Sequence, residues 1–283
     1  MHPSAALLLS AVAVAVLAAP AYPALSSSAA TPDALDTASA YFSLLADKVQ
    51  QSRSALPACD LTAAQLPSSS VSPSLPPPSD GLVLKHVAIG RGTQNYTCSS
   101  ANSTAAPAAV GAVATLFNAS CIAAAYPDLL NLLPAVVLPF NLTDDDVTAF
   151  SDRLYPSNLD VSGHHFFTTA STPFFNLDAP SQPLGHAACS KNNTQAAPSD
   201  SITTSTVAAT TTSSSAVSNR GQHGEPAVPW LKLLAHDSST TTGNLREVYR
   251  VQTAGGSSPA TCAGMPAAFQ VQYAAQYWFY ESA

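Results

Sequence analysis

The sequence predicts a mainly β protein, an antiparallel sandwich or barrel-like domain with a few short helices. Three observations lead to this fold class. Residues 269–280 alternate between apolar and polar side chains with the period of two that is typical of a strand. Residues 228–235 and 245–254 are two further strand-like runs, and a turn-prone stretch joins them. The three runs together predict an antiparallel meander near the C-terminus.

Length and composition describe a chain that can fold and that carries little charge. It has 283 residues, of which 46% are hydrophobic, so it can build a substantial core. Only 10% of the residues are charged, against about 25% in ordinary soluble domains. The net charge is -7, and the ten Lys and Arg residues are spread along the chain. A nucleic-acid partner is therefore not expected.

The N-terminus has the features of a secretory signal peptide, residues 1–21. Its apolar run, residues 5–19, is too short to span a bilayer and ends in small residues. Ala19-Pro20-Ala21 fits the small-x-small rule, so we expect cleavage after Ala21. We expect no membrane span in the rest of the sequence. The protein is therefore predicted to be secreted and extracellular.

Acceptor sequons for N-glycosylation support export. An Asn followed by a residue other than Pro and then by Ser or Thr can receive a glycan in the secretory pathway. Such sequons begin at Asn95, Asn102, Asn118, Asn141 and Asn192. We therefore expect a glycoprotein.

The cysteines predict disulfide bonds rather than a zinc site. None of the five stands in a CxxC spacing, and the expected extracellular environment is oxidising. Several pairings are open. Cys98 with Cys121 closes the shortest loop and is the first expectation, and Cys59 with Cys262 would join the two ends of the domain. Cys189 is then left unpaired.

Behind the signal peptide the sequence predicts three regions. Residues 22–58 form a helical extension, because apolar residues recur at helical spacing between positions 35 and 49. Residues 59–80 form a strap that is too rich in Pro and Ser for regular structure. Residues 81–283 form the β-rich domain, which contains a disordered Ser/Thr-rich loop at 199–219.

Four further elements are expected inside the β-rich domain. Alternation over residues 82–89 predicts a strand with both faces largely buried. Residues 114–118 are assigned to a strand on their Thr and Phe, although nearby Ala residues favour helix. Residues 128–133 and 144–154 are predicted helices. Thr143 can cap the second one, and the three Asp residues that follow suit its first turn.

The adjacent pair His164 and His165 raises the question of a metal or catalytic site. If the pair lies on a strand, as the flanking Phe and Thr residues indicate, the two rings point to opposite faces and cannot reach one ion. A structural role in the sheet is therefore expected, and neither a metal nor a cofactor is predicted. The other histidines of the predicted mature chain show neither HxH nor HxxxH spacing; they are His86, His186, His223 and His236.

Other chemical motifs are weak. The acidic run Asp144–Asp146 could supply a carboxylate pair for glycoside hydrolysis, but helix capping already accounts for it. Gly90-Arg91-Gly92 lacks the third glycine of a dinucleotide fingerprint, because residue 95 is Asn. A nicotinamide nucleotide is therefore not expected as a partner.

Aromatic residues near the C-terminus offer a possible surface for sugar rings. Alternation predicts that most of them fill the core. Trp230, Trp278 and Tyr280 are the ligand-binding candidates, because exposed aromatic rings can bind carbohydrate. Trp278 and Tyr280 lie off the main apolar face of their strand, which makes them the strongest of the three.

Six separated blocks carry a resemblance to a known family. From about Cys59 to Tyr280 the chain resembles a secreted domain-of-unknown-function family of fungi and bacteria, whose fungal members often carry an automatic malate dehydrogenase label. The resemblance implies no established active site. The blocks are GLVLKHVAIGRGTQNYTC, GAVATLFNASC, GHHFFTTASTPFFNLD, PWLKLLA, EVYRVQTAGGSSPATC and QVQYAAQYWFY.

Three functional hypotheses remain open at this point. The leading one is a secreted glycoprotein without established biochemical activity that associates with the cell wall or a polysaccharide. The second is an extracellular hydrolase, in which His164 or His165 and Asp178 would act as acid and base. The third is the malate dehydrogenase label, which the sequence does not support because it lacks the cofactor motif. Whether the protein is an enzyme is left open.

Expression of the full chain in a secreting eukaryotic cell tests the predicted export. We expect the protein in the medium with Tyr22 as its first residue, because signal peptidase cuts after the small-x-small motif. Treatment with an N-glycosidase should lower its apparent mass in steps. Retention of an unprocessed, unglycosylated chain in the cytosol would contradict the prediction.

Overall fold

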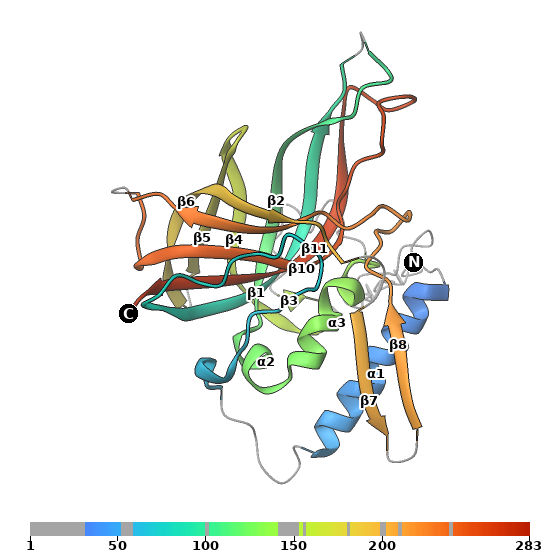
Figure 1. Cartoon of the computed structure of the whole chain (residues 1–283), viewed down its shortest axis with the longest axis vertical. Helices are drawn as coiled ribbons and strands as arrows, with labels where there is room; N and C mark the ends of the chain where they lie inside the picture. The colour runs from blue at the N-terminus through green and yellow to red at the C-terminus, as the bar shows by residue number, and fades with distance from the viewer. Residues whose placement is uncertain are drawn as a thin grey trace, which may run out of the picture.

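An antiparallel barrel of eight strands forms the centre of the protein, and helices lie against one side of it (Figure 1). This arrangement confirms the predicted mainly β fold class. The computed structural model describes residues 32–51, 59–99, 102–140, 153–154, 157–179, 182–198, 202–208, 211–237 and 240–283. The barrel strands are β1 (Leu82–Thr97), β2 (Ala108–Asn118), β4 (Leu159–Thr169), β5 (Thr172–Ala179), β6 (Gln182–Gln195), β9 (Trp230–Ala235), β10 (Leu245–Gly255) and β11 (Ala268–Ser282).

The barrel follows an up-and-down path. Each barrel strand pairs with its neighbours along the chain, and β2 pairs with β4 across the intervening helices. The first and last strands then pair along nearly their whole lengths, from Leu82 opposite Ser282 to Thr97 opposite Ala268. This pairing joins the two edges that an open sheet would expose. The predicted meander of β9, β10 and β11 is confirmed.

Alternation along the strands buries two separate apolar clusters. One fills part of the barrel interior and includes Phe175, Tyr277 and Phe279. The other lies between the barrel and the helices and includes Ile89 and Trp278. Successive strand residues point to opposite faces, so neighbours such as Tyr277 and Trp278 belong to different clusters. Much of β1 is buried on both faces, as the sequence predicts.

Helix α3 (Pro127–Val137) covers part of the outer face of the barrel. It packs on β1, β10 and β11, and most of its residues are buried. Helix α1 (Pro32–Gln51) packs on α3, and the short α2 (Ser120–Ala125) directly precedes α3. The helices predicted in the extension and at residues 128–133 are both confirmed. In the described part of the chain, no helix has the length and apolar character needed to cross a membrane.

Buried Arg91 of β1 ties the end of α3 to the barrel. Its guanidinium donates to the carbonyl oxygens of Leu138 and Phe140, each at 3.1 Å. Carbonyl groups at the C-terminal end of a helix receive no N–H donor from within the helix, so they need a donor from elsewhere when they are buried. Arg91 therefore holds the covering helix in place from the strand side.

The Pro/Ser-rich strap, residues 59–80, runs across the outside of the barrel as the blue-to-teal segment of Figure 1. A 3-10 turn, η1 (Leu61–Ala63), is its regular element. Side chains of the barrel bind its backbone. The Tyr249 hydroxyl donates to the Pro76 carbonyl at 3.0 Å, and Gln195 bonds two backbone groups of the strap. Extended backbone without its own hydrogen-bond partners is thus satisfied by the strands beneath it.

A buried ion pair between β9 and β10 lies under the strap. The Lys232 ammonium is 3.0 Å from the Glu247 carboxylate, and both side chains are almost wholly buried. Lys232 also donates to the Pro77 carbonyl, and Ser79 donates its backbone N–H and its hydroxyl to Glu247. A buried pair of charges is stable only when such additional bonds complete its hydrogen bonding.

Two disulfides join Cys59 to Cys121 and Cys98 to Cys262. The predicted pairing of Cys98 with Cys121 and of Cys59 with Cys262 is therefore wrong, whereas Cys189 is unpaired as expected. Strand pairing rather than loop length decides the connectivity. Cys98 follows β1 and Cys262 precedes β11, so the β1–β11 ladder brings them together. The other bridge fastens the start of the strap to α2.

Two stretches differ from the sequence expectation. Of the predicted helix at 144–154, residues 144–152 lie outside the described residues, and Arg153–Leu154 form the short strand β3, which pairs with β4. The region 199–219, expected to be disordered, contains strands β7 (Ile202–Ala208) and β8 (Thr211–Val217), which pair with each other. Its many Thr residues are β-branched and favour extended backbone.

The ion pair under the strap gives a prediction about stability. Replacing Lys232 by Met should lower the free energy of unfolding by about 3 to 5 kcal/mol, because the buried Glu247 carboxylate loses its cation. The double variant Lys232→Met with Glu247→Leu should recover much of that loss. Urea unfolding of the oxidised protein at neutral pH measures both. Equal destabilisation of the single and double variants would contradict the proposed coupling.

Candidate functional site

His164 and His165 lie on β4 and point to opposite faces of the barrel wall, as predicted for a strand. His165 is buried inside the barrel, with 3% of its surface exposed. Its ring stacks on Phe175 at a centroid distance of 4.2 Å. Nδ1 of His165 lies 2.9 Å from the Phe174 carbonyl oxygen, which can only accept, so Nδ1 carries a proton.

Asp178 lies near the C-terminal end of β5, and its carboxylate is hydrogen-bonded to residues of β6. Its carboxylate accepts from Nδ1 of His186 at 2.9 Å and from the backbone N–H of Gly185 at 2.7 Å. The hydrogen bond from His186 is the main reason that the pKa of Asp178 is lowered. The structure therefore does not join His165 and Asp178 into the acid and base of the hydrolase hypothesis.

The three aromatic candidates for a sugar-binding surface are all buried. Trp230, Trp278 and Tyr280 expose 2%, 1% and 7% of their surfaces. They point outward from the barrel, as alternation predicts for Trp278 and Tyr280, but the apolar cluster beneath the helices and strap covers them. These rings are therefore not available as an exposed sugar-binding surface, and their burial agrees with the expectation that most aromatic residues of this region fill the core.

The barrel interior contains a cavity of about 500 Å³. It lies at the end of the barrel where β1 ends and β2 begins, and the walls come from all eight strands, the turn between β4 and β5, and the segment before β9. At the opposite end the interior is filled by side chains such as Leu177, Leu245 and Phe279, each 0% exposed. The residues around the cavity are Gln94, Tyr96, Ala109, His165, Phe167, Ser171, Pro173, Phe175, Lys191, Thr194, Val228, Pro229, Leu231, Leu233, Arg250 and Tyr277.

Small residues on β1 and β2 leave room for the rings that form the floor of the cavity. A Cβ on Gly90 would overlap the ring of Tyr277, so glycine at this position makes room for the ring where it lies. Ala112 and Ala114 of β2 line the same interior with minimal side chains. The hydroxyl groups of Tyr273 and Tyr277 bond each other at 2.8 Å, which fixes the ring of Tyr277.

Three buried side chains that carry nitrogen, from three different strands, are among the residues around the cavity. They are Gln94 of β1, His165 of β4 and Arg250 of β10. Burial lowers the pKa of His165 to about 4, so its ring is neutral at neutral pH and leaves Nε2 as an acceptor. Gln94 and Arg250 each expose 8% of their surface. The cavity therefore combines apolar walls with a few buried hydrogen-bonding groups, as ligand sites do.

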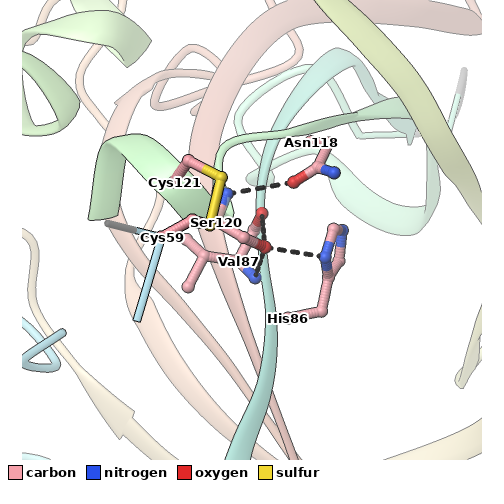
Figure 2. Close-up of a disulfide and its surroundings, with 6 residues drawn as sticks. All are labelled: Cys59, His86, Val87, Asn118, Ser120 and Cys121. Carbon is pink, nitrogen blue, oxygen red and sulfur yellow. Dashed lines mark hydrogen bonds between the residues drawn. A yellow bond between two sulfur atoms is a disulfide. The ribbon is translucent and has the colours of Figure 1, made fainter. Parts of the chain in front are cut away.

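A second buried histidine belongs to the filled end of the barrel and has a structural role. Figure 2 shows the Ser120 hydroxyl between the His86 imidazole and the Val87 backbone, beside a disulfide. The other ring nitrogen of His86 lies 2.9 Å from the Ser162 hydroxyl, and the ring stacks on Phe279. Burial lowers the pKa of His86 to about 4. The imidazole thus links α2, β1 and β4 as a neutral group.

The free thiol of Cys189 also faces the barrel core. It is 0% exposed, and burial raises its pKa to about 12. A thiol with such a pKa is protonated at neutral pH and is a poor nucleophile. Cys189 is therefore a packing residue. Among the described residues, no group of three or more His, Cys, Asp or Glu side chains could hold a metal ion.

Sequence reasoning missed Gln94 and Arg250 as residues of the cavity. A signal for Arg250 exists in the string EVYRV, where the charge falls on the same face as the apolar Val248. A cation on an inward face is a pattern typical of a binding site rather than of a core. Gln94 carries no comparable signal, because polar residues at the end of a strand are common.

A family model described as "Protein of unknown function (DUF3455)" matches residues 78–281, which covers the barrel up to Glu281, the last residue but one of β11. No curated protein and no solved structure shows significant similarity to the chain.

The two buried histidines predict a loss of stability in acid. Their folded pKa of about 4 lies below the ordinary value of 6.5, so the unfolded chain binds more protons between these two values. Stability is thus fully present above pH 6.5 and falls as the pH is lowered toward 4. Each histidine contributes roughly 3 kcal/mol to this dependence.

Urea unfolding between pH 7 and pH 4.5 measures this effect. The variant His165→Phe keeps an aromatic ring against Phe175 and should show a shallower pH dependence than the natural protein. His223 is exposed, so His223→Gln serves as the control and should leave the dependence unchanged. An unaltered slope in His165→Phe would show that this histidine already titrates normally in the fold.

Proposed function

Since the chain belongs to the DUF3455 family of proteins of unknown function, we propose its function from its own geometry: it binds one small, largely apolar molecule inside the barrel. The observation that carries this proposal is the cavity of about 500 Å³ at one end of a closed eight-stranded barrel. Barrels of this size either fill their interior with side chains or hold one small ligand. Here one end is filled and the other is hollow.

The wall chemistry supports a small ligand rather than a polymer. Aromatic and aliphatic side chains make up most of the wall, and the filled end of the barrel gives the cavity a floor. A polysaccharide chain would need an open platform, and the aromatic residues considered for that role are buried. Cell-wall association is therefore the weaker form of the extracellular hypothesis.

Binding without catalysis fits the polar groups of the cavity. No carboxylate is present among the described residues that surround it, and Nδ1 of His165 already donates to the backbone. General acid–base chemistry usually positions a histidine by a carboxylate or leaves both ring nitrogens available. The dehydrogenase label also gains no support, because that activity binds its nucleotide at the edge of a parallel sheet.

We further propose that the protein works outside the cell as a glycoprotein. Two disulfides in the described structure suit an oxidising compartment. Two of the predicted glycosylation sites, Asn102 and Asn192, are exposed and can carry a glycan without disturbing the barrel. Neither lines the cavity.

Binding of the neutral fluorescent probe N-phenyl-1-naphthylamine tests the proposed function. The probe brightens in apolar surroundings, and we expect saturable binding of one molecule per chain. Ala109 is exposed and lies at the edge of the cavity, so Ala109→Trp should block the entrance. We expect the affinity to fall about tenfold or more, which corresponds to about 1.4 kcal/mol.

The neighbouring residue supplies a matched control. Ala108 is also exposed but does not line the cavity, so Ala108→Trp should bind the probe like the natural protein. Thermal unfolding of both variants checks that the barrel is intact. Equal binding by the two variants would place the probe outside the cavity and remove the main support for the proposal.

A further inference from the structure

Arg250 is a buried cation at the cavity whose hydrogen-bonding capacity is only partly used. It lies on β10 opposite Leu231 of β9 and Tyr277 of β11, with its side chain among the residues that surround the cavity. Its Nη2 donates to the Pro229 carbonyl at 2.9 Å, and its guanidinium also donates a hydrogen bond to the Tyr277 side chain. Its Nε, although buried, has no hydrogen-bond partner among the described residues. A guanidinium can donate several further bonds and cannot be deprotonated at neutral pH.

Two other buried cations, Lys232 and Arg91, have more polar partners than Arg250 or a partner of opposite charge. Lys232 is paired with the Glu247 carboxylate at 3.0 Å. Arg91, whose Nε also has no partner among the described residues, donates through Nη1 and Nη2 to carbonyls after α3, on β1 and on β11, and to a glutamine side chain. Burying a charge without such partners is costly. Arg250 is therefore the buried cation for which the described structure supplies the least compensation.

The surroundings of Arg250 are electropositive. Lys191 stands exposed at the cavity rim, and the described residues around the cavity include no Asp or Glu. His165 adds no charge at neutral pH, because burial lowers its pKa to about 4. Gln94 Nε2 is a second buried donor without a partner. The cavity thus has two N–H donors without a partner, on Arg250 and Gln94. A ligand group that accepts hydrogen bonds and carries negative charge would satisfy both of them.

We infer that the occupant of the barrel is an apolar organic acid whose carboxylate is bound by Arg250, with Gln94 as a second donor. This inference rests on the proposed function, since it names the class of molecule that the cavity holds. A single buried cation matches a monoanion better than a dianionic phosphate. The planar guanidinium also fits the two oxygens of a carboxylate. The hydrocarbon part would lie against Phe167, Phe175 and Leu233.

Two fluorescent probes with the same aromatic skeleton test the charge preference. 1-Anilinonaphthalene-8-sulfonate carries one negative charge, whereas N-phenyl-1-naphthylamine lacks the sulfonate. We expect the natural protein to bind the anionic probe about 10- to 100-fold more tightly, as charge-assisted hydrogen bonds predict. 2-Naphthoate should displace the anionic probe, and 2-naphthalenemethanol should displace it far less well. Displacement by naphthalene-2-sulfonate but not by 2-naphthoate would overturn the carboxylate assignment.

Variants of Arg250 locate the preference. Arg250→Met should reduce the affinity for the anionic probe by about 10- to 100-fold while the neutral probe binds within about twofold of the natural protein. Arg250→Lys should restore part of the preference, because it restores the charge without the planar fork. Arg246 lies on the same strand with its side chain about half exposed, and Arg246→Met should change neither affinity.

The outcomes separate this inference from the proposed function. If neither probe binds in the cavity, the proposed function fails and the inference fails with it. If both probes bind equally and Arg250→Met binds both like the natural protein, the cavity binds ligands but does not select acids, and the inference alone is overturned. The comparison of the two probes on the natural protein decides the question even if an Arg250 variant does not fold. Thermal unfolding without ligand adds a readout, and Arg250→Met should melt at the same or a higher temperature because a buried charge that has no carboxylate partner is removed.

Discussion

The antiparallel ladder between β1 and β11 is the constraint on which the rest of the structure depends. It joins the first and last strands of the barrel over their whole lengths and so converts an open meander into a closed wall. Closure gives the barrel wall an inner face and an outer face. Both faces carry buried apolar side chains where the helices and the strap cover the wall from outside. It also brings Cys98 and Cys262 together, so the second disulfide reinforces the same contact.

The two ends of the barrel interior have different composition and different roles. At one end, large apolar side chains and the neutral His86 pack without a hollow. At the other, glycine and alanine on β1 and β2 make room, and Arg250 is buried without a carboxylate. A natural core of this size would gain stability from an apolar residue at that position. Local choices that cost stability are a common mark of functional sites. The cavity and the buried charge of Arg250 lie at the same end of the barrel, so the two observations support the same proposal of a ligand site.

The strands could be predicted in large part because their signal is local. The period of two found β11, β10 and β9, and the same rule placed His164 and His165 on opposite faces. The burial of Trp278 and Tyr280 could not be found this way, because it depends on α3 and the strap, which pack on the outer face from distant parts of the chain. The prediction of the cysteine pairing failed for the same reason, because the strands that bring Cys98 and Cys262 together, β1 and β11, are far apart in the sequence.

By itself the sequence determined the fold class, the main strands and the oxidised character of the chain, since alternation, turn residues and cysteine spacing act over short distances. Only the tertiary structure decided which side chains share a site. Gln94, His165 and Arg250 lie on β1, β4 and β10, and the sequence around each of them does not indicate that the other two are close to it in space. They meet in one cavity because closing the barrel turns the inward faces of all three strands toward a common axis.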